Sequence, residues 1–167
     1  QTLPLHELTE QMGQILDEQG LFFGHNTSDA WEEASWMALY ATGQEVDSDE
    51  LDWDRVPDTQ QLMSLQTLMQ QRIETRQPFS YLINQAWFCG LKFYVDARAL
   101  VPRSYFGEWI PDQFSPWLDA GKVQRALDLC TGSGCIAIAL AYAFPDAQVD
   151  ATELSADALE VAKINVT

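Results

Sequence analysis

The residues best suited to chemistry lie towards the end of the chain, where a pair of glycines is followed by an acidic residue. Gly132 and Gly134 come directly after a short apolar run, and Glu153 follows a second such run. Glycines let the backbone approach a ligand without a Cβ clash, and a helix that begins after them presents unpaired N–H groups. A carboxylate at the end of the next strand can accept hydrogen bonds from both hydroxyls of a ribose. This combination predicts a binding site for an adenosine cofactor.

Two classes of adenosine cofactor fit these residues. Gly132, Gly134 and Ala137 satisfy the dinucleotide fingerprint in its Gly/Ala form, which suits NAD. Asp128, however, lies four residues before Gly132, where a dinucleotide site usually has an apolar residue. A carboxylate at this position could hold the charged ammonium group of S-adenosylmethionine. The spacing favours S-adenosylmethionine and leaves a nicotinamide cofactor as the alternative.

The elements that must position these residues alternate between strand and helix. We expect a buried strand over 124–130, a tight turn over 131–134, a helix over 135–144 ended by Pro145, a second strand over 147–152, and a helix from 156 towards 166 capped by Ser155. This order is the opening of a doubly wound parallel sheet, so the sequence predicts an α/β fold.

The first 78 residues have a different, helical pattern. Apolar residues recur at three- and four-residue spacing over 5–16, 31–41 and 62–73. Gly20 and Gly43 can end the first two helices, residues 25–28 offer N-caps for the second, and Asp58 precedes the third. An acidic connector covers residues 45–54. We therefore expect a small helical bundle.

Between these two parts, aromatic and β-branched residues predict a β-hairpin or a pair of short strands. Tyr81–Ile83, Trp87–Cys89 and Leu91–Val95 are separated by Asn84 and Gly90. Residues 105–118 are rich in Trp, Phe and Pro, and we expect a broken helix there. The predicted organisation is a helical domain over 1–78, a hairpin linker over 79–102 and an incomplete cofactor-binding domain over 103–167.

The charge, cysteine content and apolar stretches of the chain limit the partners, the cellular compartment and the metal sites that we expect. The 167 residues include 25 acidic and nine basic side chains, a formal net charge of −16, of which −12 falls within residues 1–78. So acidic a chain is expected to repel nucleic acid and to suit a basic partner. Three cysteines are too few for a disulfide framework and fit a reducing cytoplasm, and we expect no metal site. No apolar stretch of about 18 residues is present, so we expect no membrane association.

Several motifs resemble one known enzyme family. Residues 128–136 (DLCTGSGCI) resemble motif I of the class I S-adenosylmethionine-dependent methyltransferases, which have a Rossmann-like fold. Residues 86–96 (AWFCGLKFYVD) and 100–104 (LVPRS) resemble the HemK-like protein-glutamine N5-methyltransferases. The Pro-Arg-Ser form, together with residues 21–31 (LFFGHNTSDAW), is similar to the branch that methylates a glutamine of ribosomal protein uL3 rather than one of peptide release factors.

The resemblance implies which residues hold the cofactor. The family's cofactor loop falls on Cys130, Thr131, Gly132, Ser133 and Gly134, and its ribose-binding acid falls on Glu153. Many relatives have Gly at the position of Cys130 and Asp at the position of Glu153. The family's N-terminal helical domain docks the protein substrate, and a strand ribbon links this domain to the catalytic domain.

The resemblance also implies a reaction, the transfer of a methyl group to a glutamine side-chain nitrogen. The family's Asn-Pro-Pro-Tyr motif, which holds the substrate amide, does not occur in these 167 residues. We therefore assign no catalytic residue and expect an N-terminal portion that is inactive alone and self-associates through an incomplete sheet. Two alternatives remain: a non-catalytic fragment that folds or oligomerises through its helical domain, and an NAD-dependent oxidoreductase.

Overall fold

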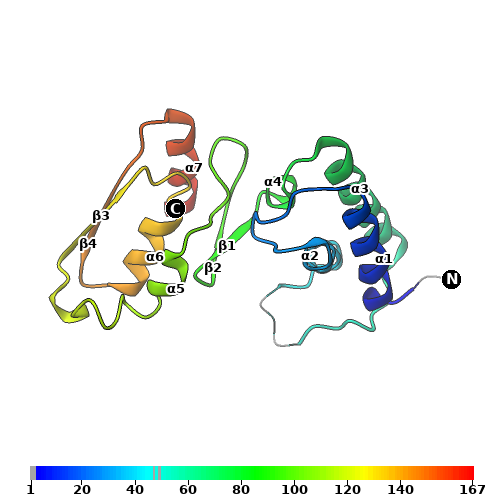
Figure 1. Ribbon diagram of the computed structural model, residues 1–167, viewed down its shortest axis with the longest axis horizontal. Helices are drawn as coiled ribbons and strands as arrows, with labels where there is room; N and C mark the ends of the chain where they lie inside the picture. Colours follow the sequence, from blue (N-terminus) through cyan, green and yellow to red (C-terminus); the bar gives the residue numbers. More distant parts are fainter. Residues whose placement is uncertain (1–2, 47, 49) are drawn as a thin grey trace. The chain divides into compact units, whose positions relative to one another are not determined.

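The computed structural model describes residues 3–46, 48 and 50–167, and it has a mixed α/β fold (Figure 1). The chain divides into two compact units, Gln1–Leu82 and Ile83–Thr167. The division falls within a short helix over residues 79–83. Among the described residues, no helix combines the length and apolar character needed to cross a membrane.

The first unit contains the three expected helices. They are α1 (Leu5–Glu18), α2 (Ala30–Thr42) and α3 (Thr59–Thr75). Asp58 caps α3 in a reciprocal capping box with Gln61, and Gly43 ends α2 in a left-handed conformation, as expected. The N-cap of α2 is Asp29, one residue after the predicted range 25–28, because its carboxylate accepts a hydrogen bond from the Glu32 N–H at 2.8 Å.

A buried ion pair joins α2 to α3. Arg72 Nε donates to Glu33 Oε1 at 2.6 Å, and both side chains are almost completely buried. Arg72 also donates to the Phe22 carbonyl at 2.9 Å, and Thr27 donates to Glu33 at 3.2 Å, so the pair fixes the loop between α1 and α2. Burial raises the pKa of Glu33, although the hydrogen bond from Arg72 opposes this.

The strand prediction for Tyr81–Ile83 is wrong. These residues lie in the short helix α4 (Phe79–Ile83), which begins directly after Pro78. Three apolar residues in a row fit either a helix or a strand, so periodicity alone could not decide between them. The hairpin itself is confirmed: β1 (Ala86–Phe88) pairs antiparallel with β2 (Leu91–Phe93).

The second unit is built around one parallel strand pair. Strand β3 (Arg125–Leu129) pairs with β4 (Gln148–Thr152), with Leu129 opposite Thr152 at the end where the site residues follow. Helix α6 (Cys135–Ala143) connects the two strands and contacts both, and α7 (Ala156–Val166) follows β4 (Figure 1). The expected broken helix is present as α5 (Phe106–Trp109) with turns after it, followed by the 3-10 helix η1 (Ala120–Lys122).

Strand β3 is less buried than its apolar sequence suggested. Leu127 and Leu129 are 58% and 66% exposed, whereas Asp128, on the opposite face of the strand, is buried. Side chains alternate along a strand, so Asp128 faces α6 while the two leucines lie on the face that α6 does not cover. The core of the unit lies on the helix side and in the hairpin, where Phe88, Phe93, Ile110, Cys135 and Ala139 pack together.

Candidate cofactor site

The loop between β3 and α6 turns sharply through three residues with positive φ. Cys130, Gly132 and Gly134 have φ values of 61°, 58° and 83°. The Gly134 N–H donates to the Thr131 carbonyl at 2.9 Å, and the Thr131 N–H donates to the Thr152 carbonyl at 3.0 Å. The loop is therefore closed on itself and attached to the end of β4.

The two glycines have different roles in this loop. A Cβ atom at Gly132 would meet nothing within 4 Å, so the backbone there borders open space. A Cβ atom at Gly134 would lie 3.4 Å from the Ala162 Cβ, so Gly134 is where the loop approaches α7. Gly132 thus offers the bare backbone that a cofactor could approach, and Gly134 allows close packing behind it.

Cys130 occupies a conformation that favours glycine. Its φ of 61° lies in the left-handed region, where a Cβ atom is strained. Glycine, which has no Cβ atom, would adopt this conformation without that strain. Cys130 is exposed and free, so its side chain does not fill the loop.

Asp128 holds the loop from the end of β3. Its side chain is 9% exposed, and Oδ2 accepts hydrogen bonds from the Thr131 hydroxyl at 2.6 Å and from the Ala137 N–H at 3.2 Å. Ala137 is the third residue of α6, so the carboxylate also satisfies an unpaired N–H at the start of that helix. The ammonium-binding role of Asp128 stays a prediction, and the structure adds this loop-fixing role.

Glu153 holds the same loop from the end of β4. Its Oε2 accepts a hydrogen bond from the Gly132 N–H at 2.8 Å, and its Oε1 accepts one from the Ser155 N–H at 2.9 Å. These backbone donors, Ser155 first and Gly132 second, lower the pKa of Glu153 and favour its charged form. The structure thus brings Asp128 and Glu153 to the same loop from the ends of adjacent strands.

The remaining predicted residues lie on the inner side of the loop. Thr131 is buried, and Ser133 is only 2% exposed. The Ser133 carbonyl accepts a hydrogen bond from Asn165 on α7 at 2.8 Å. No motif points to Asn165, although it follows the buried residues Ala158, Val161 and Ala162 on one face of α7, where a polar residue is unexpected.

A mostly apolar cavity of about 370 Å³ lies beside the loop, lined by residues of α6 and α7 such as Ile138 and Leu159. Of the predicted site residues, only Thr131 and Gly134 line it. The candidate site is therefore the loop with its two carboxylates, and not this cavity. Within the described part of the chain, no group of three or more His, Cys, Asp or Glu side chains could hold a metal ion.

Comparisons with known proteins give the site a context. The family model described as "Methyltransferase small domain" matches residues 114–167, which include the loop and both carboxylates. Two curated relatives from Neisseria meningitidis, of serogroups A and B, are each 42% identical over 151 residues, which is 90% of this chain and 50% of the relative. A relative from Burkholderia pseudomallei is 45% identical over 148 residues, which is 87% of this chain and 48% of the relative.

All three relatives are named ribosomal protein uL3 glutamine methyltransferase. The chain spans about half the length of these relatives. The resemblance expected from the sequence motifs is confirmed: residues 114–167 match a methyltransferase family model, and over nine-tenths of its length the chain is similar to ribosomal protein uL3 glutamine methyltransferases.

Proposed function

We propose that this chain carries the cofactor-binding part of an S-adenosylmethionine-dependent protein-glutamine N5-methyltransferase. The observation that carries the proposal is the loop 131–134, held between Asp128 and Glu153 at the ends of adjacent parallel strands. A parallel strand pair joined by α6 is the unit from which a Rossmann-like cofactor domain is built.

The residues of the loop fit this cofactor. The backbone at Gly132 borders open space, so a ligand can approach it closely. A carboxylate oxygen can accept more than one hydrogen bond, so Glu153 can bind ribose hydroxyls in addition to its two backbone donors. We propose that Asp128 and Glu153, together with loop residues Cys130, Thr131, Gly132, Ser133 and Gly134, form the cofactor site.

S-adenosylmethionine, when bound, supplies an electrophilic methyl group on a sulfonium. The acceptor would be a glutamine amide nitrogen, which is a weak nucleophile because its lone pair is delocalised into the carbonyl. Rate enhancement must then come largely from positioning the two groups, and the fixed loop serves this by holding the cofactor in one orientation. No residue of this sequence is assigned to the amide, and we propose that the chain alone binds cofactor without transferring the methyl group.

The proposed substrate is a ribosomal protein of the uL3 type. The names of the curated relatives support this choice over a peptide release factor. Residues 1–78 carry a net charge of −12, which suits a basic protein substrate and disfavours direct contact with nucleic acid. We propose that this helical part docks the substrate.

Calorimetric titration of the chain with S-adenosylmethionine, S-adenosylhomocysteine and NAD tests the cofactor. Binding of the two sulfur compounds supports the proposal, and binding of NAD alone would replace it with an oxidoreductase. The absence of all binding would favour a non-catalytic fragment. The substrate is tested by incubating an active enzyme that contains this sequence with purified uL3 and with release factors, and methylation of release factors alone would overturn the choice of substrate.

A further inference from the structure

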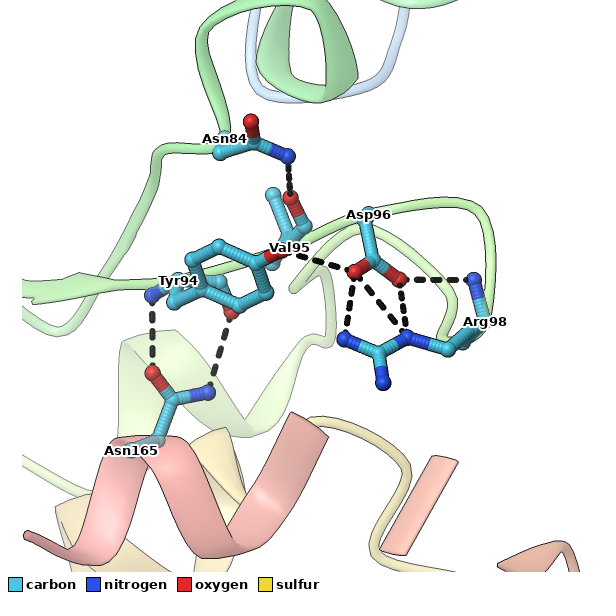
Figure 2. A network of polar contacts seen from close by, with 6 residues as sticks. All are labelled: Asn84, Tyr94, Val95, Asp96, Arg98 and Asn165. Carbon is cyan, nitrogen blue, oxygen red and sulfur yellow. Dashed lines mark hydrogen bonds and ion pairs between the residues drawn. The ribbon is translucent and has the colours of Figure 1, made fainter. Parts of the chain in front are cut away.

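One side chain of α7 joins the candidate loop to the backbone that follows the hairpin. Asn165 Oδ1 accepts a hydrogen bond from the Tyr94 N–H at 2.7 Å, and its Nδ2 donates to the Tyr94 carbonyl at 3.0 Å (Figure 2). The same Nδ2 donates to the Ser133 carbonyl at 2.8 Å. Both N–H groups and the carbonyl oxygen of the Asn165 amide are therefore in use. Among neutral side chains, only an amide offers two donors and an acceptor, and Asn carries it on a shorter side chain than Gln.

The segment that Asn165 holds is itself fixed from several sides. The Val95 side chain is buried, and the backbone carbonyl of Val95 accepts a hydrogen bond from Asn84 Nδ2 at 3.0 Å. The Tyr94 hydroxyl donates to Asp96 at 2.8 Å, and Arg98 donates to both oxygens of that carboxylate (Figure 2). Residues 94–96 are therefore held in place, and Asn165 connects the loop to this fixed segment.

The loop needs such a support because a glycine lies on each side of Ser133, the residue whose carbonyl Asn165 binds. Gly132 and Gly134 place few steric limits on the backbone around Ser133. Asp128 fixes Thr131, and Glu153 fixes the N–H of Gly132. The bond from Asn165 to the Ser133 carbonyl is the third attachment of the loop by a side chain, and it lies between the two glycines.

Helix packing alone does not account for an amide at this position. Asn165 follows Ala158, Val161 and Ala162 on the buried face of α7, where an apolar side chain would bury surface without the cost of desolvating a polar group. The amide is useful here because it satisfies backbone groups on two separate segments.

We infer that Asn165 is a positioning residue for the cofactor loop. Asn165 fixes the position of the Ser133 carbonyl relative to Tyr94, and thereby the position of the backbone at Gly132 and Gly134. The inference rests on the proposed function for its effect on the cofactor, but its effect on the loop can be measured without any ligand.

The test compares two matched substitutions, Asn165→Asp and Asn84→Asp. Each replaces an amide donor with a carboxylate oxygen that faces a backbone carbonyl of residues 94–95, but only Asn165 also contacts the loop. Asn165→Ala serves as a second variant that introduces no charge. Three measurements are made on the whole chain: thermal stability, affinity for S-adenosylhomocysteine by calorimetry, and amide hydrogen exchange over residues 131–137.

We expect both Asp variants to lower the melting temperature. Only the Asn165 variants should raise amide exchange over 131–137 severalfold and weaken S-adenosylhomocysteine binding about tenfold or more, whereas Asn84→Asp should stay within twofold of wild type in both. The inference is overturned if Asn165→Asp and Asn165→Ala leave loop exchange unchanged, if Asn84→Asp alters the loop equally, or if neither Asn165 variant folds.

The result also separates the inference from the proposed function. Failure of the wild-type chain to bind S-adenosylhomocysteine would count against the proposed function alone. In that case hydrogen exchange over the loop still decides whether Asn165 positions it.

Discussion

The carboxylate of Glu153 accepts a hydrogen bond from the Gly132 N–H at 2.8 Å, which joins the end of β4 to the loop that follows β3. Its second oxygen accepts from the Ser155 N–H at 2.9 Å, so the same side chain also fixes the turn before α7. The residue that the sequence assigned to a ribose therefore also holds the backbone beside which that ribose would lie.

Glu153→Ala should weaken S-adenosylhomocysteine binding by about tenfold to a hundredfold, because it removes a charged acceptor from both the ligand and the loop. Glu153→Asp keeps the charge on a shorter side chain and should weaken this binding less than Glu153→Ala does. Calorimetry measures both affinities. Glu160→Ala is the control, since Glu160 is exposed on α7 and pairs with Lys163. Wild-type affinity in Glu153→Ala would contradict the proposed role.

Asp128→Ala should lower the free energy of unfolding by about 1–3 kcal/mol, because it leaves the Thr131 hydroxyl and the Ala137 N–H without their acceptor. Urea unfolding measures this loss. Asp150→Ala is the matched control on the neighbouring strand, where the carboxylate forms an exposed pair with Arg125 and should matter little. Equal losses in the two variants would show that Asp128 has no special role in the loop.

Cys130→Gly should raise the free energy of unfolding by about 0–1 kcal/mol. Glycine relieves the strain at a φ of 61°, but part of this gain is offset by the greater entropy of glycine in the unfolded chain. Cys130→Ala keeps the backbone strain and removes only the thiol, so it should not raise the free energy of unfolding. Chemical denaturation of both variants measures the difference, and a clear loss of stability in Cys130→Gly would refute the strain argument.

Acid should destabilise the second unit through Asp96. The hydrogen bond from Arg98 is the main cause that lowers the pKa of Asp96 to about 2, from 3.8 in the unfolded chain. A lowered pKa contributes stability that is fully present above pH 3.8 and is lost as the pH falls towards 2. NMR titration of the Asp96 carboxyl measures the pKa directly, and Arg98→Gln should raise it. A pKa that stays near 2 in Arg98→Gln would rule out this cause.

The exposed face of β3 should make the isolated chain self-associate. Leu127 and Leu129 together present apolar surface on a strand for which β4 is the only paired neighbour among the described residues. The double variant Leu127→Thr with Leu129→Thr should lower the apparent mass in light scattering. Leu154→Thr is the control, because Leu154 is even more exposed but lies outside the strands. A monodisperse monomer in the unchanged chain would contradict the expectation.

Much of the fold follows from local sequence rules. Asp58, Gly43 and Ser155 mark helix ends by capping chemistry, which depends only on neighbouring backbone. The alternation of strand and helix after residue 124 was likewise predictable from periodicity. Tyr81–Ile83 were not, because three apolar residues fit both a helix and a strand, and their surroundings decide.

The sequence by itself determined the chemical types at the candidate site and their order: a carboxylate, a glycine loop, a helix, and a second carboxylate after the next strand. Only the tertiary structure decided what each group contacts. Parallel pairing of β3 with β4 brings Asp128 and Glu153 to one loop, and the fold of α7 brings Asn165 to Ser133, 32 positions away. Such contacts depend on the three-dimensional path of the backbone, which spacing along the chain does not encode.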